Sequence, residues 1–186
     1  MAGPVFLFLG EALWLDLANT APQFHTATEQ LDVLPDADLA RAWLLAAGLP
    51  GLDHRTDPAS LFTLRTEFIR LADALATGAR PPTSSISAIN GVLRGTAGRE
   101  LLTRTAGSWR LRFLPMAPAG ALEALARSAA VTLADPLGQV RRCAEVSCQR
   151  LFVDATPHQT RAWCREQCHA STAVERRRIH RPIATA

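Results

Sequence analysis

The chain has 186 residues, of which 48% are hydrophobic, and this composition excludes a wholly disordered protein and allows one substantial core with at most a small second unit. The formal net charge of +3 is unevenly distributed, because residues 1–138 contain 11 Arg and 13 acidic residues whereas residues 139–186 contain 9 Arg and 4 acidic residues. We therefore expect an anionic partner, if there is one, to bind at the C-terminal end.

The apolar opening of the chain, MAGPVFLFLGEALWLDLA, raises the question of a signal peptide. No basic segment precedes the apolar run, and Glu11 and Asp16 interrupt it before a helix could span a bilayer. We therefore expect a cytoplasmic protein with no membrane partner. In that reducing compartment, clustered cysteines are more often metal ligands than disulfides.

Three amphipathic helices are predicted next. The first follows an N-cap at Asp36 or Asp38, the second follows Asp57, and a shorter third begins at Ser84 or Ser85. Their apolar stripes are Leu39, Trp43 and Ala46, then Leu61, Leu64, Phe68, Leu71 and Leu75, then Ile86, Ile89 and Leu93.

The hydrophobic period then changes from helical to alternating in ELLTRTAGSWRLRFLP. Trp109, Leu111 and Phe113 alternate with arginines, and the tripeptide AGS can turn the chain, so we expect a β-hairpin. A last long helix is predicted in PAGALEALARSAAVTLAD, and the segment DPLG ends it.

This order of elements predicts two domains. Residues 1–138 would form an α+β domain that is mainly helical with a small hairpin or sheet. Residues 139–181 would form a small module that holds all the cysteines, and residues 182–186 would be a tail.

The four cysteines, Cys143, Cys148, Cys164 and Cys168, form two close pairs separated by a 15-residue loop. Tetrahedral zinc coordination needs this arrangement, because each pair supplies two corners and the loop brings the pairs together. Four protein ligands leave no corner for a catalytic water, so we expect one structural Zn²⁺. The sequence has no phosphate-binding glycine loop, His-Glu-x-x-His pair or nucleophile elbow, so we expect no catalytic residues.

The residues between the pairs are consistent with such a module. RLFVDA predicts a short strand on which Phe152 fills a core too small to stand alone. A helix beginning near Trp163 would place Cys164 and Cys168 on one face. A knuckle, a hairpin and a ligand-bearing helix together make a treble-clef-like module.

Three other interpretations stay open at this point. The cysteines could form two disulfides or remain unpaired and buried, and His158 or His169 could replace one cysteine as a ligand.

The C-terminal segment resembles the CGNR zinc finger, whose members share these cysteines and a set of residues around them. The matching residues here are Cys143, Cys148, Phe152, Asp154, Thr156, Arg161, Trp163, Cys164 and Cys168. Near the other end, LWLDLANT is similar to the signature that opens the N-terminal domain accompanying this finger, with matches at Asp16, Asn19 and Thr20.

The resemblance implies a bacterial transcription regulator, often described as stress-induced, whose finger binds DNA. The N-terminal domain would sense an effector or dimerise. One departure is clear, because the family has Gly-Asn-Arg and then typically Ala-Lys after the last cysteine, whereas this chain has His169-Ala170-Ser171 and then Thr172-Ala173. Two cations are therefore missing, and if they contact phosphate in relatives, this chain has fewer such contacts.

Other arginines near the finger could compensate. The candidates for contacts with the DNA backbone are Arg161, Arg165, Arg176, Arg177, Arg178 and Arg181. Alternatively, Arg176 to Arg178 are a solvated helix end, and Arg161 forms a structural pair with Asp154.

Four residues in the N-terminal apolar segment are candidates for binding a small-molecule effector, because polar groups in such a segment need partners: Trp14, Asp16, Asn19 and Thr20. Alternatively, Asn19 and Thr20 only terminate a helix. The runner-up function is accordingly a small-molecule-binding protein or enzyme of specialised metabolism that keeps the zinc module as a brace. A homodimer would suit a symmetric operator, but no sequence feature displays its interface.

Overall fold

The computed structural model describes residues 6–24, 32–53, 56–105 and 107–170. The elements are α1 (Leu13–Ala18), the short 3₁₀ helix η1 (Pro22–Phe24), α2 (Ala37–Ala46), α3 (Pro58–Ala76), α4 (Thr83–Arg94), β1 (Gly98–Thr105), β2 (Ser108–Pro115), α5 (Ala121–Ala134), β3 (Gln139–Arg142) and β4 (Leu151–Asp154). This is the predicted α+β fold with a mainly helical N-terminal part, small antiparallel sheets and a cluster of cysteines at the C-terminal end.

Local capping chemistry determines where two helices begin. The side chain of Asp36 accepts hydrogen bonds from the backbone N–H groups of Asp38 and Leu39, which decides between the two predicted caps of α2. Asp57 accepts from Ser60 N at 2.6 Å and caps α3, as predicted. α4 begins at Thr83, slightly before the predicted serines.

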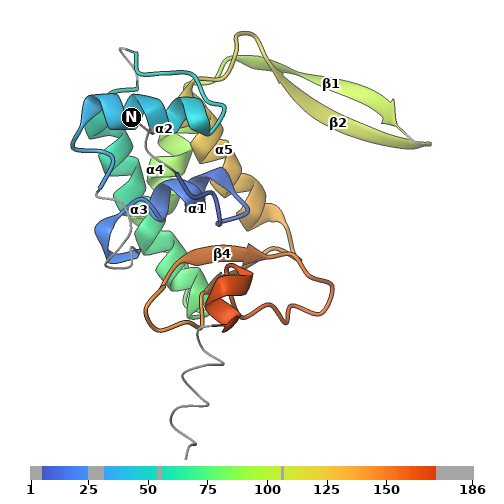
Figure 1. Cartoon of the computed structure of the whole chain (residues 1–186). Coiled ribbons are helices and arrows are strands. Elements are labelled where there is room, and N and C mark those ends of the chain that lie inside the picture. Colours follow the sequence, from blue (N-terminus) through green and yellow to red (C-terminus); the bar gives the residue numbers. More distant parts are fainter. Residues whose placement is uncertain (1–5, 25–31, 54–55, 106, 171–186) are drawn as a thin grey trace, which may run out of the picture.

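The core lies where α1, α3 and α5 meet, with α1 in front of the other two in Figure 1. Trp14 of α1 is fully buried, and its ring meets that of Phe68 of α3 edge to face at a centroid distance of 5.6 Å. Its indole N–H also donates to Thr132 Oγ1 of α5 at 3.0 Å. One tryptophan therefore joins the three helices at their common contact.

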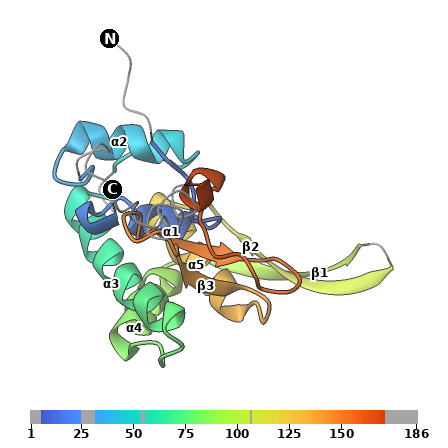
Figure 2. The ribbon, with the colours of Figure 1, turned by 60° about the horizontal axis from the view of Figure 1, so that its bottom comes forward.

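The β1–β2 hairpin extends away from the helices (Figures 1 and 2). Its strands pair antiparallel from Gly98 opposite Pro115 to Thr105 opposite Ser108, which confirms the predicted hairpin and its turn. Gly107 has a φ of +83°, a conformation that glycine adopts without strain. Almost every described residue of β2 is exposed, so this sheet contributes little to the core.

The second sheet, β3–β4, packs against the helices, unlike the β1–β2 hairpin. Val140 of β3 and Leu151 of β4 belong to the same buried hydrophobic cluster as Trp14 and Phe68. The core is thus continuous across residue 138, and the division into domains at that residue stays a prediction. Among the helices that the structure describes, none combines the length and hydrophobicity that crossing a membrane requires.

Candidate metal centre and its attachment to the helical body

The four cysteine sulfurs meet in one buried cluster. One sulfur from each of Cys143, Cys148, Cys164 and Cys168 lies within 4.8 Å of the other three, and the four residues are buried and not disulfide-bonded. The Sγ atoms of Cys148 and Cys164 are 3.5 Å apart, and those of Cys164 and Cys168 are 3.8 Å apart. Sulfurs bound to one zinc at about 2.3 Å would be separated by about 3.8 Å in a tetrahedron.

Electrostatics favour a cation at the centre of this cluster. A hydrogen bond from Cys143 lowers the pKa of Cys148 well below that of a free thiol, whereas the hydrogen bond with Cys143 raises the pKa of Cys164 far above it. Burial raises the pKa of Cys168 to about 11. Four thiolates so close together cannot all ionise without a positive ion between them, and Zn²⁺ supplies that charge.

The four cysteines therefore form a site for one structural Zn²⁺. Four sulfur ligands complete a tetrahedral shell, so no position remains for a reacting water. Within the described residues, His158 lies in an exposed loop, while the ring of His169 packs against Trp163 at a centroid distance of 4.4 Å. Neither histidine joins the cysteine cluster.

Hydrogen bonds to sulfur complete the surroundings of the metal site. The backbone N–H of Cys164 lies 3.5 Å from Cys143 Sγ, and Nη1 of the buried Arg150 lies 3.7 Å from Cys148 Sγ. Zinc bound to four thiolates carries a net charge of −2, which a nearby guanidinium partly offsets. Arg150 was not among the predicted site residues, and its position two residues after a ligand was the available signal.

Local backbone structure places each pair of cysteines. Cys143 and Cys148 lie in the turn that connects β3 to β4, where Cys148 N donates to Glu145 O at 2.9 Å. Cys168 lies in a helix whose described part covers residues 166–170, and Cys164 precedes it. The predicted helix start near Trp163 is therefore a few residues too early, because the chain around Cys164 turns toward Cys143 before the helix begins.

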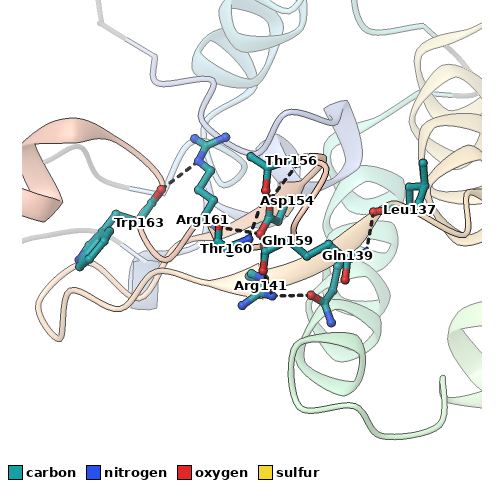
Figure 3. A network of polar contacts seen from close by, with 9 residues as sticks. All are labelled: Leu137, Gln139, Arg141, Asp154, Thr156, Gln159, Thr160, Arg161 and Trp163. Atoms are coloured by element: carbon teal, nitrogen blue, oxygen red, sulfur yellow. Dashed lines mark hydrogen bonds and ion pairs between the residues drawn. The ribbon is translucent and has the colours of Figure 1, made fainter.

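A polar network around Asp154 holds the loop between the two cysteine pairs (Figure 3). The fully buried Asp154 accepts hydrogen bonds from Thr156 Oγ1 at 2.6 Å and from Arg161 N at 2.9 Å, and Arg141 Nε lies 3.1 Å from its Oδ2 as an ion pair. Burial alone would raise the pKa of Asp154, but these bonds and the charge of Arg141 hold it below its usual value.

The alternative role of Arg161, an ion pair between its side chain and Asp154, is wrong. Arg141 of β3 supplies the charge, whereas Arg161 contributes only its backbone N–H. The register explains this, since Arg141 lies opposite Phe152 on the paired strand and can reach Asp154.

The Arg161 side chain instead clamps the segment around Cys164. Its Nε donates to Trp163 O at 3.0 Å and its Nη2 to Cys164 O at 2.6 Å, while Nη1 pairs with Glu11. The guanidinium also lies over the Phe152 ring, 4.8 Å from the centroid. Every nitrogen of this side chain thus has a partner within the chain, and its role in DNA contact stays a prediction.

Two family models match the chain, and the boundary between them lies between residues 136 and 139, before the first cysteine. A CGNR zinc-finger model matches residues 139–181, which contain the metal site. The model named ABATE, described as "Putative stress-induced transcription regulator", matches residues 11–136. The chain belongs to the ABATE family. No curated protein matches the sequence.

In this ABATE-family chain, the N-terminal signature residues make contacts inside the protein. The carboxylate of Asp16 accepts from Gly10 N at 2.8 Å, and Thr20 Oγ1 donates to Leu17 O and accepts from Arg65 Nη1 at 3.1 Å. The side chain of Asn19, the C-cap of α1, hydrogen-bonds both backbone polar groups of Leu151. Ligand binding by these residues and by Trp14 stays a prediction.

The arginines predicted to contact DNA fall into two groups in the ABATE-family chain. Arg161 and Arg165 lie beside the metal ligands, and a hydrogen bond from Arg165 lowers the pKa of Cys168 against the larger effect of burial. Arg176, Arg177, Arg178 and Arg181 lie outside the described residues.

Proposed function

We propose that this protein is a cytoplasmic bacterial transcription regulator that binds DNA through its zinc module, mainly by contacts between arginine side chains and phosphate. The family assignment supports a regulator. The observation that best supports DNA binding is the positive charge of the zinc module. The metal itself has no open coordination position for a reaction. Residues 139–186 contain 9 Arg and 4 acidic residues, and a basic surface is what a polyanion recognises.

Several charged groups of the module lie in its interior. Two of the module's four acidic residues, Glu145 and Asp154, are buried, and Asp154 is paired with Arg141. The negative charge of the thiolates would also lie in the interior, beside Arg150. Arg150 is itself buried and Arg141 pairs with Asp154, so these two cations offset the two buried acidic residues, and the remaining residues keep the same excess of five positive charges.

Phosphate contacts suit this module better than base reading. Arg176, Arg177 and Arg178 are consecutive, so on a helix they would point in three directions and could not all enter one groove. The residues in place of Gly-Asn-Arg include His169, whose ring packs on Trp163 of the same module. We therefore propose that affinity comes from the backbone and that sequence selectivity is modest.

Fluorescence anisotropy on duplexes from the protein's own genomic neighbourhood tests this function. The zinc-loaded full chain should bind at low salt, and the double variant Arg177→Ala/Arg178→Ala should lower the slope of log affinity against log salt by about 2. A matched control, Arg80→Ala/Arg127→Ala, removes the same charge from the helical body and should leave the slope unchanged. No binding at low salt by the zinc-loaded protein would overturn the proposal.

A second candidate function is small-molecule binding by the N-terminal part, with the zinc module as a brace. The observation that favours it is a pocket of about 440 Å³ beside α3, lined by Asp32, Phe62 and Arg65 among others. Arg65 also contacts Thr20 of the N-terminal signature. Thermal-shift screening with metabolites tests it. A ligand that raises the melting temperature without changing DNA affinity supports this function, whereas unchanged melting across the screen counts against it.

A further inference from the structure

The β1–β2 hairpin has two chemically different faces. Residues directly opposite each other in an antiparallel pair share a face, and successive residues alternate between faces. The register therefore gives one face that we call the apolar face, formed by Gly98, Glu100, Leu102, Arg104, Trp109, Leu111, Phe113 and Pro115. The other, the basic face, includes Arg99, Leu101, Arg110, Arg112 and Leu114.

Two contacts confirm that the apolar face is assembled as the register predicts. The guanidinium of Arg104 lies over the indole of Trp109, 5.8 Å from the ring centroid. The Phe113 ring covers Gly98 so closely that a Cβ there would lie 2.0 Å from Phe113 Cζ. Side chains from both strands thus pack together on one side of the hairpin.

The apolar face is exposed over its whole length. Trp109 is 64% exposed, Leu111 62%, Leu102 59% and Phe113 37%. A lone two-stranded hairpin is marginally stable in water, and it gains stability when its apolar face packs against another surface. A cluster of large apolar side chains on a projecting arm also marks an interaction site in a soluble protein.

The residues along the apolar face are arranged so that two copies related by two-fold symmetry would be complementary. Glu100 lies two residues toward the body from Leu102, and Arg104 lies two residues toward the tip. If a second copy packs face to face about an axis perpendicular to the strands, β1 lies over β1 in the opposite direction. Glu100 of each copy then meets Arg104 of the other.

The same operation pairs the remaining large side chains. Phe113 meets Trp109 of the second copy, and Leu102 and Leu111 lie near their own counterparts around the axis. This is the requirement of an isologous interface, in which the same patch is complementary to itself. The same operation places the two helical bodies at opposite ends of the paired arms.

We propose that the β1–β2 hairpin is a dimerisation arm, whose apolar face packs on the apolar face of a second copy of this chain. The exposed side chains offer on the order of 400 Å² per copy, so a pair buries on the order of 800 Å² before Glu100 and Arg104 are counted. This lies below the roughly 1,000 Å² of a stable specific interface, so we expect a weak dimer that forms reversibly. The basic face, with its three arginines, repels its own copy and stays in solvent.

Sedimentation velocity of the zinc-loaded full chain from about 1 to 200 μM tests this arm. We expect a monomer–dimer equilibrium, and we expect Leu102→Ser to weaken it at least tenfold. Leu101→Ser is the matched control, because Leu101 is also exposed, at 46%, but lies on the basic face. Its dimerisation should equal that of the unmodified chain, and circular dichroism should show that both variants are folded.

Charge reversal tests the symmetry itself. Glu100→Arg and Arg104→Glu should each weaken the dimer, because each places like charges together twice. The double variant in one chain should restore it, and an equimolar mixture of the two single variants should form mixed dimers. A chain that stays monomeric at 200 μM, equal effects of L101S and L102S, or failure of both restorations would overturn the proposal. The proposal would also be overturned if the unmodified chain is monomeric and L102S abolishes its DNA binding, since the apolar face would then contact nucleic acid.

Discussion

The side chain of Asn19 forms two hydrogen bonds with the backbone of Leu151, 132 residues later in the chain. Its Nδ2 donates to Leu151 O at 2.8 Å, and its Oδ1 accepts from Leu151 N at 2.9 Å. The amide thereby satisfies both polar groups of a buried strand residue, as a neighbouring strand would. The end of α1 is in this way fastened to β4 of the zinc module.

Replacing Asn19 should destabilise the protein. Asn19→Ala would leave a buried N–H and a buried carbonyl without partners, so we expect the free energy of unfolding to fall by about 2–4 kcal/mol. Asn19→Asp should cost as much, because a carboxylate would replace the amide donor that faces Leu151 O. Urea denaturation at saturating zinc measures both, and the exposed Asn90 provides the control Asn90→Ala. A wild-type midpoint for Asn19→Asp would contradict the assignment of the two bonds.

Asp16 should make stability depend on pH. Burial raises its pKa to about 6 from 3.8, although hydrogen bonds from the backbone of Gly10 and Leu9 act in the opposite direction. Between about pH 4 and pH 6 the folded protein keeps a proton that the unfolded chain releases. The free energy of unfolding contributed by Asp16 therefore falls as pH rises through this window, by about 3 kcal/mol in total.

Asp16→Asn isolates this contribution, since asparagine keeps an oxygen that accepts from Gly10 N. The unfolding free energy of this variant, minus that of the unmodified chain, should grow between pH 4 and pH 6 and then level off. Zinc loss at low pH affects both proteins and cancels in the difference. Asp38→Asn, at a side chain that is 92% exposed, provides the comparison for loss of an exposed carboxylate. A flat curve for Asp16→Asn would show that Asp16 titrates normally.

Arg161 should control how tightly the module holds its metal. The guanidinium donates to the carbonyls of Trp163 and Cys164, a fork that lysine cannot reproduce. We expect Arg161→Lys to release zinc to a chromogenic chelator about tenfold faster or more, as loss of a group that orients a metal ligand does. His158→Ala changes an exposed residue of the same module and should leave the rate unchanged. Equal rates for both variants would rule out the clamp.

Removing zinc should weaken the helical body as well as the module. Val140 and Leu151 belong to the core that contains Trp14 and Phe68, so unfolding of β3 and β4 would expose part of that core. We expect one zinc per chain by elemental analysis, and a lower melting temperature in a single calorimetric transition after chelation. Two transitions, with the upper one unaffected by chelation, would show that the body and the module fold independently. Free titration of all four thiols in the folded, untreated protein would contradict the metal site itself.

Several features follow from the sequence alone because they depend on neighbouring residues. The spacing of Cys143, Cys148, Cys164 and Cys168 predicted the metal site, since each pair needs only a short local turn. Asp57 predicted the start of α3, and alternation around Trp109 predicted the hairpin, for the same reason. Capping, periodicity and ligand spacing are all properties of a few adjacent residues.

Only the tertiary structure decided which distant groups meet. Nothing near Asn19 in the sequence points to Leu151, and the cation beside Asp154 is Arg141 rather than Arg161 because strand pairing brings it there. The alternation at Trp109 likewise leaves open whether its apolar side faces a core. That side is exposed because the hairpin extends away from the helices. Local patterns specify elements, whereas the partners of buried polar groups depend on how those elements dock.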